Sequence, residues 1–295
     1  MQIVISTPTG NVGRAAVDRL LEADADVEVV VVHREPARLA HLEARGVYVR
    51  QGSLDNVEAL TRATGGADAL LWVTPTVPTA ANLRASQNRF GVAVAAAVRA
   101  NAIPRVVNLS SIGAQHDAGT GPIAGLHDVE EMLDATGADV LHLRAGYFFE
   151  NYLPQVQVIR AMGAIMLPVA GEHALPMIGT RDIGVVAADM LLDDAWSGRE
   201  IHGLHGPEDL TFDDAAAAIS AAVGRTIGHN EIDELQARMG LSMLGLSNSV
   251  IEAMLEMYHA IDTGHLVPAE PRTPETTTPT TLGGWAAEAM APKLA

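Results

Sequence analysis

The sequence predicts an α/β protein with a doubly wound, mainly parallel sheet and a smaller, mainly helical C-terminal lobe. Short apolar runs in the first half are nearly continuous rather than alternating, which is typical of strands buried on both faces. Helical patterns separate these runs, as they do in successive β-α-β units. A glycine-bearing turn joins the first apolar run directly to the first helical pattern. With 295 residues and 48% hydrophobic content, the chain is long enough to bury a large core.

The expected elements alternate regularly up to about residue 150. Strands are expected at residues 2–5, 27–32, 47–49, 69–73, 105–109 and 139–143. Helices are expected near residues 12–23, 36–44, 56–64, 80–101 and 122–136. Connections of this kind are right-handed, and a ligand binds beyond the carboxyl ends of the strands. We therefore expect residues 1–150 to form one domain with its site at that edge of the sheet.

The alternation ends after residue 150. A crossover helix at 180–193 and a strand at 200–205 are expected to return the chain to the sheet. Thr211 to Asp214 resembles a capping box and predicts a helix over 212–223. The methionine-rich segment 231–261 has a helical pattern, whereas the prolines and threonines of 268–281 predict an extended surface crossing before a short helix at Trp285. Residues 151–295 are thus expected to form a smaller substrate or lid lobe, except for residues 180–205, which are expected to rejoin the sheet.

Charge and composition exclude several classes of protein. A net charge of −17 argues against direct nucleic-acid binding, which depends on Lys and Arg neutralising phosphates. The absence of cysteine excludes disulfides and thiolate metal sites, and the 11 histidines show no zinc-like grouping, so no metal site is expected. No apolar run approaches the length of a membrane span, and no signal peptide is visible. We expect a cytoplasmic monomer or homodimer that acts on a small molecule without a membrane partner.

The turn from Thr7 to Gly13 is the first candidate binding feature. It reads T-x-x-G-x-x-G, with Thr7 at the place of the usual first glycine, and it lies between a strand and a helix. This arrangement is typical of a Rossmann-type unit, in which the helix N-terminus and the loop backbone bind the pyrophosphate of a dinucleotide. The sequence therefore predicts an NAD(P)-binding domain. The candidate pyrophosphate-binding residues are Thr7, Thr9, Gly10, Asn11, Val12 and Gly13.

The end of the second strand favours NADPH over NADH. In an NAD-preferring site an acidic residue about twenty positions beyond the glycines binds the ribose 2′-hydroxyl. The chain has His33 and Arg34 there and no carboxylate. Arg34 and Arg38 are candidates for the 2′-phosphate, because a guanidinium donates bidentate hydrogen bonds to phosphate. The alternative is that both arginines are solvated residues of a surface helix.

Small or polar residues follow the other strand ends. They are individually weak signals, because turns favour such residues, but together they outline a nucleotide site. Those expected to flank the adenine and the adenosine ribose are Ser53, Leu54, Thr74 and Pro75. Ser110 closes the fifth strand, where a nicotinamide would lie.

A proton relay of the common kind is missing. Short-chain dehydrogenases normally use a tyrosine and a lysine four residues apart, the lysine lowering the pKa of the tyrosine. Lys293 is the single lysine of the chain, and none of the tyrosines at 48, 147, 152 and 258 is followed by lysine. The sequence therefore excludes the standard Tyr/Lys pair.

Three segments resemble the NmrA-like, atypical short-chain dehydrogenase/reductase group: residues 7–13, 105–111 and above all 143–152. The segments 181–183 and 202–211 are similar to the same group. Members include NADPH-dependent quinone reductases, reductases of plant and alkaloid metabolites, and nucleotide-sensing regulators without catalysis. The resemblance implies that residues 9–12 wrap the pyrophosphate, that Ser110 approaches the nicotinamide ribose, and that Gly146, Tyr147 and Phe148 border the nicotinamide.

Candidate catalytic residues are Tyr147, His127 and Ser111, of which Tyr147 and His127 are candidate proton donors. Many relatives carry a histidine with a glutamate four residues later in the helix at 122–136. His127 and Glu131 have that spacing here, whereas counting back from Gly137 puts Leu126 and Glu130 in that register. The alternatives are a surface role for His127 and a packing role for Tyr147. Methionines 239, 243, 254 and 257 are expected either to pack in the core or to line an apolar substrate pocket.

These features predict an NADPH-binding oxidoreductase that transfers hydride to a small apolar quinone, enone or carbonyl acceptor without a Tyr/Lys relay. The alternative is a non-catalytic NADP(H) redox-sensing regulator that acts through a protein partner, since such a protein also needs no catalytic acid.

Overall fold

The computed structural model describes residues 1–23 and 25–295, and its centre is a seven-stranded sheet. The order is β10-β6-β5-β4-β1-β2-β3, and every neighbouring pair is parallel. The strands are β1 (Gln2–Ile5), β2 (Glu28–His33), β3 (Tyr48–Gln51), β4 (Ala69–Val73), β5 (Arg105–Ser111), β6 (Asp139–Ala145) and β10 (Arg199–Leu204). The predicted doubly wound α/β fold is confirmed.

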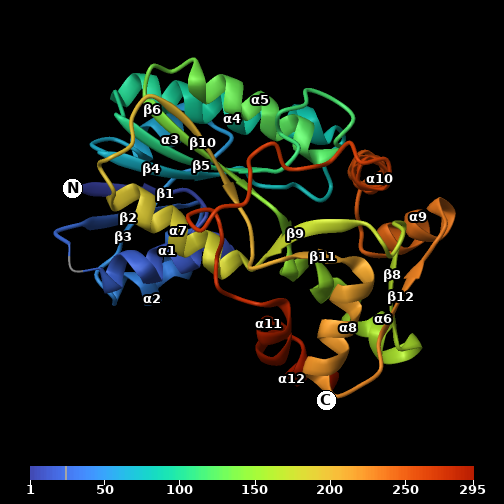
Figure 1. Ribbon diagram of the computed structural model, residues 1–295. Helices are drawn as coiled ribbons and strands as arrows, with labels where there is room; N and C mark the ends of the chain where they lie inside the picture. Colours follow the sequence, from blue (N-terminus) through green and yellow to red (C-terminus); the bar gives the residue numbers. More distant parts are fainter. Residues whose placement is uncertain (24) are drawn as a thin grey trace.

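Helices cover both faces of this sheet (Figure 1). One face carries α1 (Asn11–Glu22), the 3-10 turn η1 (Pro36–Leu39) with α2 (Ala40–Glu43), and α7 (Thr180–Leu192). The other face carries α3 (Val57–Ala63), α4 (Leu83–Asn101) and α5 (Pro122–Asp134). Successive residues of β1 belong to different cores: Ile3 and Ile5 pack toward α1 and α7, and Val4 packs toward α3 and α4. This double burial explains why the strands read as unbroken apolar runs.

A third core lies in the C-terminal lobe, where the short strands were not predicted from the sequence. The three-stranded sheet contains β7 (Tyr147–Phe148), β9 (Ala174–Ile178) and β11 (Asp209–Thr211), and a two-stranded sheet contains β8 (Ala164–Leu167) and β12 (Gly228–Glu231). The lobe helices are η2 (Phe149–Gln155), α6 (Val156–Met162), α8 (Phe212–Val223), α9 (Glu234–Met243), α10 (Asn248–Asp262), α11 (Leu282–Ala289) and α12 (Ala291–Leu294). Strands this short leave almost no periodicity in a sequence.

Several boundaries differ from those expected. The segment 231–261 is not one helical stretch: β12 ends within it, and α9 and α10 are separated by a turn at Gly245, where φ is +78°. α4 begins at Leu83 rather than at residue 80, because the Asn82 side chain caps the helix by accepting from the Ala85 backbone N–H. The predicted capping box at Thr211 and Asp214 is present in full at the start of α8.

Two long-range features complete the fold. The predicted crossover at 180–205 reaches the sheet, where β10 pairs with β6. Residues 268–281, called the strap below, cross the surface without a helix, and Thr277 forms an isolated bridge with His205. Throughout residues 1–23 and 25–295, no helix combines the length and the apolar character needed to cross a membrane.

Candidate functional site

A groove of about 480 Å³ lies at the carboxyl ends of β1, β2, β3 and β4. We call it the polar groove. It is lined by Ser6, Thr7, Pro8, Thr9, Val32, His33, Arg34, Gly52, Ser53, Leu54, Asp55, Pro75, Thr76, Val77, Pro78, Arg89 and Phe90. The structure thus brings together Thr7, Thr9, His33, Arg34, Ser53, Leu54 and Pro75 from the predicted site.

The loop before α1 leaves the start of that helix open to an anion. Gly10 is its N-cap residue, and no side chain of the described residues caps it. The first N–H groups of a helix lack intrahelical partners and carry the positive end of its dipole. A Cβ at Gly13 would lie 2.0 Å from the Thr7 carbonyl oxygen, so only glycine lets the loop fold onto the helix. Asn11, Val12 and Gly13 form the first turn of α1, and this geometry suits a phosphate group.

The two arginines expected at the 2′-phosphate have different positions. Arg34 is exposed and lines the polar groove, and none of the described carboxylates forms an ion pair with it. Arg38 does not line the groove among the described residues, and its guanidinium lies 3.6 Å from the Glu35 carboxylate. Arg89 of α4 takes a second cationic position in the groove, which the sequence did not indicate.

Two of the polar side chains predicted at the strand ends already form hydrogen bonds within the protein. The Ser53 hydroxyl donates to the Asp55 carboxylate at 2.6 Å. The Thr74 hydroxyl accepts from the Trp72 indole N–H at 3.0 Å, and Thr74 lines the neighbouring cavity rather than the groove. Both hydroxyls are therefore held in fixed orientations by the protein.

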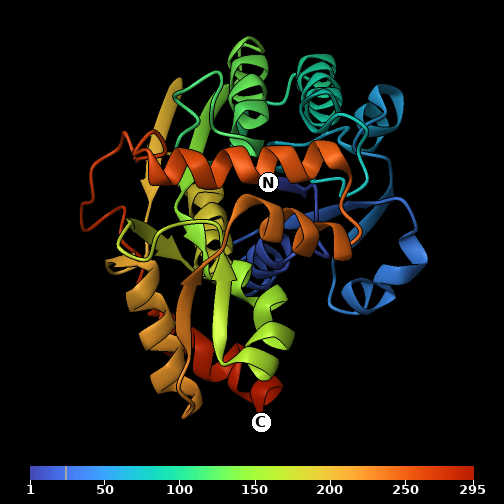
Figure 2. The same cartoon turned by 90° about the vertical axis from the view of Figure 1, so that its right-hand side faces the viewer.

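A second hollow of about 370 Å³ adjoins the groove, and Thr76 lines both. We call it the apolar cavity. It is lined by Val73, Thr74, Thr76, Leu83, Gln87, Leu109, Ser110, Ser111, Ile112, Pro122, Ile123, Leu126, Gly146, Tyr147, Phe148, Asn151, Leu175, Val250, Met254, Met257, Ile261 and Leu266. α10 forms one wall; it is the long orange helix that crosses Figure 2 between the green helices of the sheet domain and the lobe.

Ser110, Ser111 and Tyr147 line the apolar cavity together. Ser110 is buried, and its hydroxyl has no hydrogen-bond partner in the described residues. An unpartnered buried hydroxyl is uncommon in a folded protein. Burial raises the pKa of the Tyr147 phenol well above its usual range, with the nearby Tyr258 hydroxyl at 3.4 Å adding to the effect. Tyr147 therefore stays neutral and is a weak acid.

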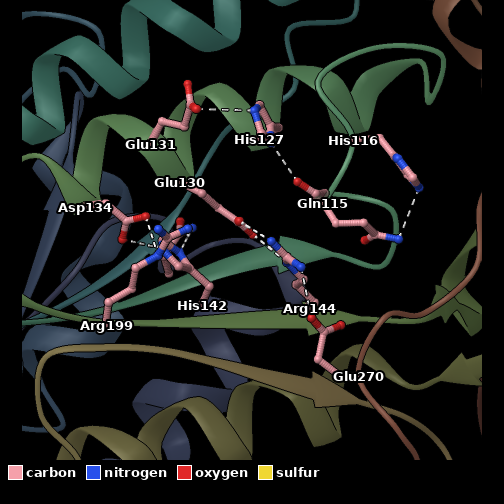
Figure 3. Close-up of polar contacts among 12 residues, drawn as sticks. Gln115, His116, His127, Glu130, Glu131, Asp134, His142, Arg144, Arg199 and Glu270 are labelled. Atoms are coloured by element: carbon pink, nitrogen blue, oxygen red, sulfur yellow. Dashed lines mark hydrogen bonds and ion pairs between the residues drawn. The ribbon is translucent and has the colours of Figure 1, made fainter.

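His127 is not among the described residues that line the apolar cavity, so the structure does not support its predicted role as proton donor. Its Nδ1 atom lies 2.8 Å from the Ala114 carbonyl oxygen and its Nε2 atom 3.6 Å from Glu131 (Figure 3). Leu126 and Glu130 point inward instead, Leu126 to the cavity and Glu130 to the buried side of α5. The reason is the helical rotation of 100° per residue, which turns neighbours to different surfaces.

Glu130 belongs to a buried ion triad that fastens three segments (Figure 3). Arg144 of β6 donates to both Glu130 oxygens, at 3.1 and 2.7 Å, and to Glu270 of the strap at 2.9 Å. Burial opposes the charge, yet hydrogen bonds to Glu130 and the two carboxylate charges hold the pKa of Arg144 above its usual value. The triad fixes α5 and the strap against the sheet beside the apolar cavity.

Sequence reasoning missed several lining residues, notably Gln87, Arg89 and Asn151. Of the methionines, Met254 and Met257 line the cavity and also pack against the lobe core, whereas Met239 and Met243 on α9 are exposed. Within the described ranges, no group of three or more His, Asp or Glu side chains is arranged to hold a metal ion.

Comparison with known proteins assigns the family. The model of the NmrA-like family matches residues 1–279. The chain belongs to the NmrA-like family. The predicted resemblance is confirmed, and the loop at Thr7–Gly13 and the 143–152 segment both lie within the matched region.

Relatives of this family member include enzymes that use nicotinamide nucleotides. The chain is 30% identical to the NAD(P)H azoreductase of Xenophilus azovorans over 87% of this chain and 86% of the relative. It is 25% identical to quinone oxidoreductase 2 of Escherichia coli over 86% of each. The structure of the Citrobacter triphenylmethane reductase with NADP(H) superposes with a TM-score of 0.82 at 20% identity, covering 98% of this chain and 100% of the other. The last similarity shows the fold.

Proposed function

We propose that this NmrA-like protein is an NADPH-dependent reductase that transfers hydride to a small, uncharged quinone-like acceptor. The observation that carries the proposal is that the polar groove and the apolar cavity adjoin each other at Thr76, which lines both. A dinucleotide lying along the groove would extend its nicotinamide end toward Ser110 in the wall of the apolar cavity. The azoreductase and quinone oxidoreductase relatives support the same reaction class.

The residues of the groove would bind and orient the cofactor, which supplies the hydride when bound. The uncapped N-terminus of α1 would bind the pyrophosphate, and Arg34, which has no ion-pair partner among the described residues, would bind a 2′-phosphate. Ser110 in the wall of the apolar cavity, whose hydroxyl has no partner among the described residues, would lie beside the nicotinamide ribose. These three contacts would fix the reacting end of the cofactor at the wall of the apolar cavity.

Protonation of the reduced acceptor does not require a side-chain acid in this proposal. Tyr147 is a poor acid because burial raises its pKa, and His127 points elsewhere. A hydroquinone monoanion, formed when a quinone accepts hydride, takes its proton from water. The cavity residues then act by packing against the acceptor and holding it beside the nicotinamide.

The test is NADPH oxidation by the purified protein with a panel of quinones, followed by the absorbance of the reduced nicotinamide. We expect turnover with small neutral quinones, and an Ser110→Ala variant that lowers kcat/KM about three- to tenfold, the effect of one lost hydrogen bond. Ser86→Ala is the matched control, because Ser86 is also buried, has a hydroxyl without a partner among the described residues, and lies outside both hollows. Bound NADPH with no turnover above background would reject catalysis and favour the sensing alternative.

A further inference from the structure

The described side chains that line the apolar cavity carry no formal charge. Aliphatic residues and methionines make up most of the wall, and its polar members, including Tyr147, are neutral. A quinone that accepts hydride becomes a hydroquinone monoanion, whose negative charge lies on oxygen. Such a charge is costly in apolar surroundings unless it is paired or hydrogen-bonded. The side chains of this wall can therefore stabilise that oxygen only as neutral hydrogen-bond donors.

The two side-chain amides of the cavity wall differ in their accessibility. Gln87 is buried, and its Nε2 donates to the Pro122 carbonyl oxygen at 2.9 Å. Asn151 is exposed and lines the same cavity. Burial raises the pKa of Tyr147, and a hydrogen bond from Asn151 opposes that rise, so the Asn151 amide lies beside the phenol of a residue that also lines the cavity. Because an amide nitrogen carries two N–H groups, Asn151 still has a donor for a ligand.

The backbone that carries Asn151 is anchored on both sides. Phe149 and Tyr152, which precede and follow it in η2, are fully buried in the core of the lobe. The Glu150 carboxylate accepts from the Trp285 indole N–H at 3.2 Å and from the first backbone N–H of α7 at 3.1 Å. The accessible side chain of Asn151 thus extends from a fixed turn. A donor held in place before the reaction stabilises developing charge without a cost of reorganisation.

We propose that Asn151 is a catalytic residue whose amide N–H donates a hydrogen bond to the acceptor oxygen that becomes negative during hydride transfer. The inference rests on the proposed reductase function and adds a residue to its chemistry. The quinone gains one hydride with two electrons from the reduced nicotinamide, which is thereby oxidised, and the resulting monoanion takes one proton from water. Asn151 transfers no proton in this step, so the contact needs no side-chain acid.

The pKa of a bound nitrophenol tests this contact without turnover. 4-Nitrophenol has the ring size of a small quinone, and its coloured phenolate carries a negative charge on oxygen, as a hydroquinone anion does. Its absorbance is followed against pH on protein saturated with NADP⁺, in the wild type and in Asn151→Leu, which is similar in size but has no donor. A hydrogen bond to an anion is stronger than one to a neutral phenol. We therefore expect the pKa of bound 4-nitrophenol to be about one to two units higher in Asn151→Leu.

The same substitution should slow hydride transfer without weakening the binding of the nucleotide. The single-turnover rate constant for NADPH oxidation by 1,4-naphthoquinone should fall about 10- to 100-fold in Asn151→Leu, the effect of one hydrogen bond to a charged group. The Kd for NADPH should change less than about twofold.

Asn248→Leu is the matched control. Asn248 is also an exposed asparagine, and it lies on α10, which forms a wall of the cavity, but it lines neither hollow among the described residues. Both the pKa of bound 4-nitrophenol and the single-turnover rate should stay near their wild-type values in this variant. Asn151→Ala serves as the second variant if Asn151→Leu does not fold, and the same shifts are expected.

The outcomes separate this inference from the proposed function. An unchanged pKa of bound 4-nitrophenol, or an unchanged single-turnover rate, in the Asn151 variants would overturn the inference and leave the reductase function intact. A rise in that pKa that Tyr147→Phe reproduces in full, with no further rise in the double variant, would assign the contact to Tyr147 and also overturn it. Failure of the proposed function appears elsewhere, as absent turnover of 1,4-naphthoquinone with NADPH by the wild type, and does not affect the nitrophenol titration.

Discussion

Replacing Arg34 with alanine should weaken the binding of NADPH much more than that of NADH. Arg34 lines the polar groove at the end of β2 and forms no ion pair among the described residues. NADPH differs from NADH by the 2′-phosphate, so a guanidinium that contacts this group contributes only to the binding of NADPH. The two nucleotides therefore report on the same site with and without the contact.

The magnitude follows from the exposure of Arg34. A hydrogen bond to a charged group contributes roughly 1.5–3 kcal/mol, and solvent competition at an exposed side chain favours the lower end. Since about 1.4 kcal/mol corresponds to a tenfold change, we expect the Kd for NADPH to rise about tenfold. Arg89 remains in the groove and preserves part of the positive potential. The Kd for NADH should change less than about twofold.

The assay is titration of each reduced nucleotide with protein, followed by nicotinamide fluorescence at fixed ionic strength. Arg38→Ala is the matched control, since this substitution removes the same charge from the same segment. Arg38 pairs with Glu35 and does not line the groove among the described residues. Its NADPH affinity should remain close to that of the wild type. Equal loss of NADPH and NADH in Arg34→Ala, or a larger effect from Arg38→Ala, would refute the assignment.

Three further predictions concern the reacting site and its support. Because burial raises the pKa of Tyr147, its phenol stays protonated as the pH increases, and the pH profile of kcat should show no ionisation of Tyr147 below pH about 10. A change of kcat with pH in that range that disappears in Tyr147→Phe would contradict this. Gly13→Ala should abolish nucleotide binding and lower the free energy of unfolding by about 1–3 kcal/mol in denaturant titrations, because the new Cβ would lie 2.0 Å from the Thr7 carbonyl oxygen. Gly10→Ala should keep the stability of the wild type, because its Cβ would lie 3.5 Å from the same oxygen. Glu130→Gln should lower the free energy of unfolding by about 3 kcal/mol, because it leaves a buried guanidinium partly unpaired. Glu131→Gln, at an exposed position, should change that free energy by less than about 0.5 kcal/mol. Similar values for the two variants would disprove the role of the triad.

The predicted sheet matches the structure because its signal is local and redundant. Each strand of the central sheet is buried on both faces, so a run such as Ile3–Ile5 identifies it without knowledge of its partners. The short strands of the lobe lack this redundancy. β7 has two residues, and its pairing with β9 depends on chain that lies about thirty residues away.

Candidate site residues at strand ends were easier to predict than those on helices. The carboxyl ends of parallel strands meet at one edge, so the topology alone brings Thr7, Arg34 and Ser110 to the same side of the sheet. A helix offers no such rule, since one residue of error in register rotates a side chain by about 100°. That rotation separates His127 from Leu126 on α5.

The sequence by itself determined the parallel sheet, the glycine-bearing turn from Thr7 to Gly13 and the absence of a Tyr/Lys pair, because each depends on residue types in short, contiguous patterns. The tertiary structure alone decided that Arg89 joins the groove while Arg38 leaves it, and that the Gln87 side chain packs against Gly125. Those features depend on how α4 and α5 pack against each other and on the sheet. Contacts between helices far apart in the chain are set by complementary surfaces, which no local pattern encodes.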